Sequence, residues 1–183
     1  DMLTPKMGRV LLAEPFMLDP NFKRSVVMLC EHQDDGTVGF ILNKTLELTL
    51  PDAIPELPDF KVPIYFGGPV EPDTLHFFHK IETLEGCQEV MDGVYWGGNF
   101  EMLKIIIESG NISPRDIRFF LGYAGWGSGQ LTEEMKEKSW IVSEGEDQYI
   151  FRNRASTLWR SILMEMGGDF RLMANFPEDP RLN

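Results

Sequence analysis

The sequence has few of the residues that build disulfide frameworks or metal centres. Its 183 residues include only two cysteines, Cys30 and Cys87, and three histidines. So few cysteines are typical of a reducing compartment, and we expect two free thiols in a cytoplasmic protein. A closed structural zinc site needs four cysteine or histidine ligands and would consume nearly all of these residues. We therefore expect no bound metal and no cofactor.

Long apolar runs are also absent. A helix that crosses a membrane needs about 20 predominantly apolar residues in succession. The longest runs here, such as residues 105–107 (III), are far shorter. The pattern predicts a soluble protein with no membrane partner.

Positive charge is in short supply. The chain has 17 Lys and Arg residues against 29 Asp and Glu residues, which gives a formal net charge of −12. Because proteins draw most of their non-specific affinity for nucleic acid from Lys and Arg, this charge disfavours direct nucleic-acid binding. A basic face would need the few arginines that lie close together in the sequence: Arg115, Arg118, Arg152, Arg154 and Arg160.

Apolar residues, by contrast, are plentiful and make up 43% of the chain. A domain of this length buries roughly 70% of its unfolded surface, so we expect one domain over residues 1–183. Runs rich in Val and Leu at 8–13 and 25–32 predict buried strands. The segment Asp34-Asp35-Gly36 predicts a hairpin that pairs residues 26–31 with residues 37–42. Further short strands are predicted at 64–66, 74–79, 93–96, 117–123 and 140–143.

Helices are predicted mainly in the second half. Asn99 is a suitable cap for a helix whose apolar residues share one face and which ends before Gly110. Two more helices are predicted, one within 127–138 and one over 154–166. Four prolines make residues 47–63 an irregular surface excursion. Strands and helices do not alternate as βαβ units, so the sequence predicts an α+β fold.

Cys30, Glu31 and His32 form the first group with potential chemistry. Alternation along a strand places Cys30 and His32 on one face and Glu31 on the other, so the three cannot converge without help from elsewhere. We favour a structural role, with Cys30 packed as a small apolar residue. A hydrolase or metal-dependent enzyme that uses all three stays open as an alternative.

Two histidines lie in the segment His76-Phe77-Phe78-His79. The aromatic context favours a strand, which sends residues three positions apart to opposite faces. We favour partly buried histidines satisfied by backbone groups over a catalytic metal held by His32, His79 and a carboxylate.

Residues 119–131 (FFLGYAGWGSGQL) predict a strand, a glycine-rich loop and a helix, a layout that can cradle an anion. The glycine spacing matches no phosphate-binding motif, and Glu133 and Glu134 would repel a phosphate. We favour glycines that allow tight turns, with Trp126 anchoring the loop in the core. Gly125 and Gly127 remain candidate binding residues, and the turn Gly67-Gly68-Pro69-Val70 is interpreted as structural.

Several motifs in the same order make nearly the whole chain resemble the AlgH/YqgE family of small bacterial proteins. The strongest is 118–131 (RFFLGYAGWGSGQL), in which Ser128 stands where the family commonly has proline. The others are 8–13 (GRVLLA) with Pro15, 19–22 (DPNF), 24–27 (RSVV), Glu31 with His32, Gly39, 42–44 (LNK), 67–70 (GGPV), 75–79 (LHFFH), Trp140 and 179–183 (DPRLN).

The resemblance implies a mixed, branched or barrel-like β-sheet surrounded by helices. Members often carry the label of transcriptional regulator, through an association with alginate regulation. The family has no established reaction, cofactor or catalytic residue to transfer. Nothing in the sequence resembles a helix-turn-helix or a winged helix.

The leading functional hypothesis is therefore a regulatory or adaptor protein that acts indirectly, through a protein partner or a small ligand. The enzyme described above and direct DNA binding are the alternatives. Strand ends and hairpin loops could bring polar residues of the family-like motifs into one binding cluster. Its members would be Asn21, Arg24, Glu31, His32 and Asn43.

Overall fold

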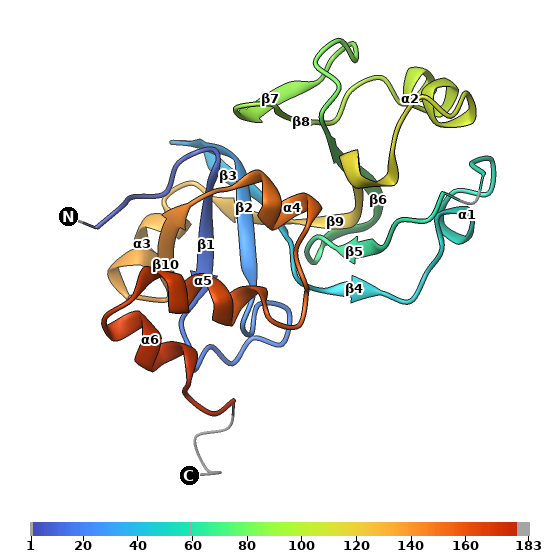
Figure 1. The fold of residues 1–183 in the computed structure, drawn as a ribbon. Coiled ribbons are helices and arrows are strands. Elements are labelled where there is room, and N and C mark those ends of the chain that lie inside the picture. The colour runs from blue at the N-terminus through green and yellow to red at the C-terminus, as the bar shows by residue number, and fades with distance from the viewer. Residues whose placement is uncertain (1, 59, 179–183) are drawn as a thin grey trace.

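The computed structural model describes residues 2–58 and 60–178, which contain strands, α-helices and one 3-10 turn (Figure 1). The strands are β1 (Arg9–Ala13), β2 (Val26–Gln33), β3 (Gly36–Ile41), β4 (Thr45–Leu46), β5 (Ile64–Phe66), β6 (Val70–His79), β7 (Gln88–Met91), β8 (Val94–Trp96), β9 (Ile117–Gly127) and β10 (Trp140–Glu144). The helices are α1 (Leu50–Ala53), α2 (Phe100–Glu108), α3 (Gln130–Lys136), α4 (Asp147–Phe151), α5 (Leu158–Met166) and α6 (Asp169–Ala174), and the 3-10 turn η1 is Pro114–Asp116.

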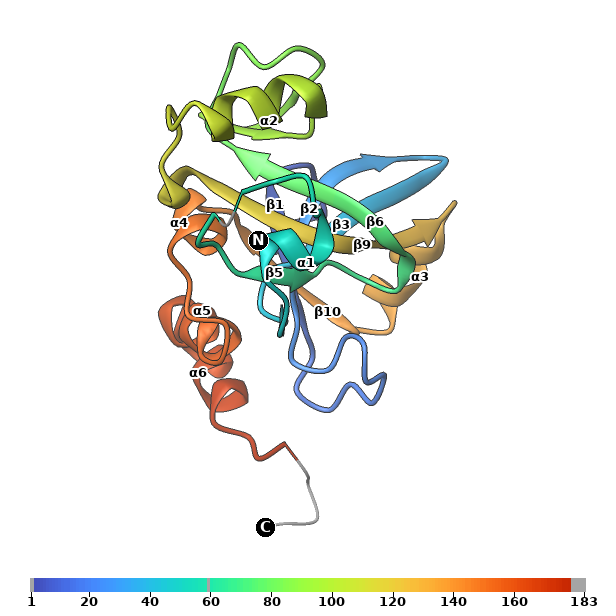
Figure 2. The same cartoon turned by 90° about the vertical axis from the view of Figure 1, so that its right-hand side faces the viewer.

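The strands form one branched sheet in the order β10-β1-β2-β3-β9-β6-β8-β7. The branch lies at β9, whose end pairs with β3 while its first half pairs with β6 on one side and, in parallel, with β5 on the other. Figure 2 shows β6 and β9 running side by side across the molecule. The predicted α+β fold and branched sheet are confirmed. A closed barrel is not formed, because β10 and β7 do not pair within the described residues.

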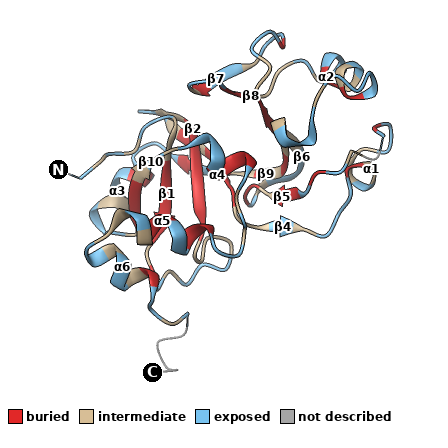
Figure 3. Ribbon diagram, viewed as in Figure 1, coloured by how far each residue is buried: buried red, intermediate tan, exposed pale blue. Residues whose placement is uncertain are grey.

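Both faces of the β1–β2–β3 part of the sheet are buried (Figure 3). Side-chain alternation sends Val26, Met28 and Cys30 into a core covered by α4, α5 and α6. The intervening Val27 and Leu29 enter a second core, which α3 covers. Two buried faces explain why this strand is a continuous apolar run. A third core lies under α1 and α2.

Local signals were reliable for the hairpin and for α2. β2 and β3 pair from Val27↔Ile41 to Gln33↔Gly36 around a turn at residues 34–35, as predicted. The Asn99 side chain accepts a hydrogen bond of 3.0 Å from the Met102 N–H at the start of α2. No helix among the described residues is long and apolar enough to cross a membrane.

Several predictions need correction. The expected glycine-rich loop is strand up to Gly127, because Gly125 and Gly127 pair with Val38 and Gly36 of β3. Residues 47–63 are only partly irregular, since they contain α1 and bury Leu50 and Leu57. The last predicted helix is α5, which begins at residue 158, and α4, α6, β4 and β7 were not predicted. Residues 179–183, which complete the resemblance, lie outside the described residues.

The 67–70 turn has the structural role that we predicted. Gly122 of β9 has φ +72°, and a Cβ atom there would collide with the carbonyl oxygen of Gly68. Only glycine permits this close approach of two backbones at a positive φ.

Candidate functional site

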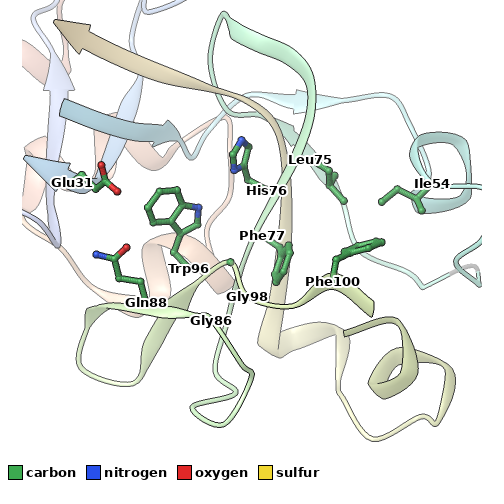
Figure 4. Close-up of a pocket in the computed structure, with 11 residues that line it drawn as sticks. Glu31, Ile54, Leu75, His76, Phe77, Gly86, Gln88, Trp96, Gly98 and Phe100 are labelled. Atoms are coloured by element: carbon green, nitrogen blue, oxygen red, sulfur yellow. The ribbon is translucent and has the colours of Figure 1, made fainter. Parts of the chain in front are cut away.

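A cleft of about 570 Å³ runs along the outer edge of β6 (Figure 4). Its wall is built from β2, β6, β7, β8, the end of α1, the start of α2 and the turns beside them. Volumes of this size are typical of small-molecule and peptide sites. The lining residues are Glu31, Ile54, Leu75, His76, Phe77, Gly86, Gln88, Trp96, Gly97, Gly98 and Phe100.

The cleft exists because β8 is shorter than β6. β8 ends at Trp96, which pairs with Phe78, and Gly97 closes the ladder by donating a hydrogen bond of 2.9 Å to the Phe77 carbonyl. The chain then turns away through Gly97 and Gly98, both at positive φ. Successive residues of a strand point to opposite faces. Residues 75–77 all line the cleft, so it runs along the strand edge rather than over one face.

Four polar side chains of the cleft have unused hydrogen-bonding capacity. Within the described residues, the Glu31 carboxylate, the Gln88 amide and the Trp96 indole N–H make no hydrogen bond or ion pair. The buried Nε2 atom of His76 also lacks a partner. A buried polar atom without a partner costs about 1–3 kcal/mol, so the His76 Nε2 atom requires an explanation. A site that receives a ligand is one such explanation.

Burial sets the charge of this cleft. Desolvation lowers the pKa of His76, and the nearby Glu71 opposes this only as a smaller effect. The imidazole packs 4.9 Å from the Phe40 ring and 6.4 Å from the Trp96 ring, measured between centroids. The histidine is therefore neutral at neutral pH, and Glu31 is the charged residue among those lining the cleft.

A second hollow of about 390 Å³ adjoins the cleft at Glu31. It includes Asp35, Tyr123 and Gly125, and its charged lining residues are again acids. The two hollows share the Glu31 side chain, and the charged residues that line them, Glu31 and Asp35, are acids, so we call the two together the acidic groove.

The predicted single cluster is not formed. Arg24 and Asn43 meet at the start of β2, where Asn43 donates a hydrogen bond of 2.9 Å to the Arg24 carbonyl. Glu31 and His32 lie near the other end of β2. Glu31 lies five positions after Val26 along the strand, a span of about 16 Å. The length of β2 therefore keeps Arg24 and Asn43 apart from Glu31 and His32, which we had expected to lie in one cluster.

The Arg24 end of the sheet is stabilised by internal contacts. Arg24 has φ +53°, and its guanidinium lies 4.5 Å from the centre of the Trp159 ring while donating 2.7 Å to the Phe176 carbonyl. The Asn21 N–H donates 2.9 Å to the Asp19 carboxylate. These contacts give the Arg24 and Asn43 side chains structural roles, whereas Asn21 contributes its backbone N–H. Their role in binding stays a prediction.

His32 belongs to a smaller hollow of about 190 Å³ beside Gly127. Its Nδ1 atom shares a hydrogen bond of 2.7 Å with the Thr37 hydroxyl. Ser128 donates 2.8 Å to the Asp34 carbonyl across the same hollow. Trp126, in contrast, is 5% exposed and anchors this part of the chain in the core as predicted.

The geometry does not assemble the alternative catalytic groups. Cys30 is fully buried, and burial, with a smaller contribution from Glu31, raises the pKa of its thiol. His79 is also fully buried and uses both ring nitrogens, donating to the Gly97 carbonyl at 2.7 Å and accepting from the Ile81 N–H at 3.0 Å. The described residues contain no group of three or more His, Cys, Asp or Glu side chains placed to hold a metal ion.

The arginines considered for a basic face are partly engaged in the fold. Arg118 donates to the carbonyls of Pro114, Ile117 and Phe151. Arg160 donates 2.8 Å to the Asn175 side chain. These contacts give both side chains structural roles.

Sequence reasoning selected Glu31 but not His76, Gln88 or Trp96 as site residues. These three lie on β6, β7 and β8, and β7 was not predicted at all. The local signal that could have identified them is the Gly97-Gly98 pair directly after an aromatic strand, which marks a place where backbone or ligand approaches closely.

Comparisons with known proteins agree with this fold. The family model DUF179, described as AlgH-like, matches residues 10–171. A UPF0301 protein of Chlorobium limicola is 43% identical over 100% of this chain and 97% of its own length. One from Cytophaga hutchinsonii is 41% identical over 96% of this chain and 98% of its own length.

Two solved structures are similar over almost the whole chain. The solution structure of the Pseudomonas aeruginosa AlgH protein has a TM-score of 0.75 at 26% identity and covers 96% of this chain and 97% of its own. The crystal structure of DIP2367 from Corynebacterium diphtheriae has a TM-score of 0.78 at 21% identity, with 96% and 95% covered, and supports the fold alone.

Proposed function

The chain belongs to the AlgH-like family, and from this premise we propose that it is a cytoplasmic regulatory or adaptor protein that acts by binding a partner in the β6 cleft. The observation that carries the proposal is the set of unused polar groups, Glu31, His76, Gln88 and Trp96, along a cleft of about 570 Å³. Apolar walls with a few convergent polar groups are the usual composition of a binding site.

Binding fits this composition better than catalysis does. Covalent catalysis by a hydroxyl, thiol or amine nucleophile needs that group within hydrogen-bonding reach of a base. No Ser, Cys, Thr or Lys side chain lines the cleft among the described residues. Cys30 and His32 of the enzyme alternative lie elsewhere, one in the core and one in a separate hollow.

Any effect on transcription is proposed to be indirect. The net charge of −12 and the acidic groove would repel a phosphate backbone. We therefore place the regulatory step at a protein contact. The free thiols Cys30 and Cys87 are consistent with a reducing, cytoplasmic location.

A random heptapeptide library displayed on phage tests the proposal. Peptides selected on the wild-type protein are measured again on Gln88→Trp, because Gln88 is exposed at the cleft wall and an indole there fills the cleft without touching the core. Glu89→Trp is the matched control, since Glu89 is the exposed neighbour on β7 and does not line the cleft.

We expect enriched peptides that bind Gln88→Trp about tenfold more weakly than they bind Glu89→Trp, with both variants folded at the temperature of the assay. Peptides that bind both variants equally, or a selection that enriches none, would overturn the proposal.

A further inference from the structure

The cleft also indicates the chemistry of its partner. We propose that the β6 cleft binds an extended, arginine-bearing segment of a partner protein, which adds to the β6 edge and places the guanidinium between Glu31 and Trp96. This inference rests on the proposed function, which requires only that some partner occupies the cleft.

The backbone of β6 is available for strand addition where β8 stops. The Phe77 carbonyl faces β8, because it accepts the hydrogen bond from Gly97. Backbone groups of a strand repeat their direction every second residue, so the N–H and C=O of Leu75 face the same side. β8 has already ended there, and the cleft takes its place. An extended peptide can pair with such an edge through its main chain.

The negative charge around this edge of β6 favours a positively charged side chain in the partner. Glu31 is the charged residue of the cleft, and Glu31 with Asp35 are those of the adjoining hollow, with no Lys or Arg among the described lining residues. The whole chain carries a net charge of −12, so long-range attraction also favours a basic partner. An acidic peptide would bring like charges together in a partly desolvated cleft.

The shape of the polar groups favours a guanidinium over an ammonium. Figure 4 shows the Glu31 carboxylate and the Gln88 amide on one side of the Trp96 ring and His76 on the other. A planar guanidinium can stack on an indole ring while donating two parallel hydrogen bonds to a carboxylate. It also has further N–H groups for the Gln88 amide oxygen, which lies on the same side of the indole as Glu31. An ammonium ion lacks the flat face for stacking.

A synthetic heptapeptide array tests the inference. The flanking positions are mixtures of Val, Thr and Ile, which favour extended backbone, and the central residue is Arg, citrulline, Lys or Leu. Citrulline keeps the planar shape of arginine and removes its charge. Binding constants of the best sequences are then measured by the change in tryptophan fluorescence, with wild type and with Glu31→Gln.

We expect the Arg peptide to bind wild type about 10- to 100-fold more tightly than the citrulline peptide, as for a charge-assisted hydrogen bond. Glu31→Gln should remove most of this difference and leave the citrulline peptide unaffected. Methylation of the peptide N–H groups on alternate residues should abolish binding in one register only, because only one set faces β6.

Equal binding of the Arg and citrulline peptides, or a preference that survives in Glu31→Gln, would overturn the inference. Agmatine bound as tightly as the peptide would overturn the peptide part and point to a small guanidinium compound. If the phage selection yields peptides that lack arginine and whose binding is weakened by Gln88→Trp, the proposed function stands and only this inference is refuted. If no peptide binds in the cleft, both the proposed function and this inference are refuted.

Discussion

Replacing Glu134 of α3 by alanine should destabilise the protein by about 2–4 kcal/mol, because one carboxylate pairs with two buried indoles. Its Oε1 atom accepts 3.0 Å from the Trp126 Nε1–H and 2.8 Å from the Trp140 Nε1–H. The two tryptophans are 5% and 4% exposed, so their N–H groups have little access to water. Glu134 thus ties α3 to the ends of β9 and β10.

The magnitude follows from the two hydrogen bonds. Each bond to a charged acceptor contributes about 1.5–3 kcal/mol, and the loss of both leaves two donors unpaired. Water from the adjoining hollow, which Trp126, Glu134 and Trp140 all line, can replace part of this. The expected net loss is therefore about 2–4 kcal/mol. Glu134→Gln keeps an oxygen acceptor and should lose about half as much.

Urea unfolding monitored by circular dichroism measures the change. Glu133→Ala is the matched control, because Glu133 is the neighbouring residue in α3 and its side chain pairs with the exposed Lys136 at 3.1 Å. An exposed pair of this kind contributes about 0–1 kcal/mol. If Glu134→Ala costs no more than Glu133→Ala, the double indole contact does not stabilise this part of the sheet.

Three further predictions concern buried polar groups. Burial lowers the pKa of His76, so as pH falls the unfolded state binds the proton before the folded state does, and stability should fall as pH drops through about 6.5. The melting temperature should therefore differ less between pH 7.5 and pH 5.5 in His76→Phe than in wild type. An equal difference in the two proteins would contradict this. Asn43→Ala should lower the free energy of unfolding in urea by about 2–3 kcal/mol, because it removes two hydrogen bonds and frees the positive-φ backbone of Arg24. A loss below about 0.5 kcal/mol would mean that these hydrogen bonds do not stabilise the fold. Iodoacetamide should label the partly exposed Cys87 in the native protein and the buried Cys30 only after denaturation, with the labelled sites identified by mass spectrometry. Rapid labelling of Cys30 in the native protein would instead favour the enzyme alternative.

Elements with local signals could be predicted from the sequence. α2 has its own cap at Asn99 and a one-sided apolar pattern, and both lie within eleven residues of chain. The β2–β3 hairpin has a turn signal between two apolar runs. Each depends on contacts between neighbours in the sequence, which a reader of the chain can see directly.

Elements that depend on distant partners were missed or misjudged. Gly125 and Gly127 have low strand propensity, and pairing with β3 makes them strand nonetheless. The polar residues expected to converge were separated by the length of β2. Register and strand length are decided by pairing across the sheet, so neither was visible in a local pattern.

Composition and periodicity by themselves determined the α+β class, the acidic surface and the apolar character of the buried strands, because these depend on how much of each residue type the chain contains and at what spacing. The cleft was decided only by the tertiary structure. It needs β8 to end at Trp96, β6 to continue to Leu75 beside it, and Glu31 to arrive from β2. Chain segments more than forty residues apart meet there, and only the packing of the whole sheet brings them together.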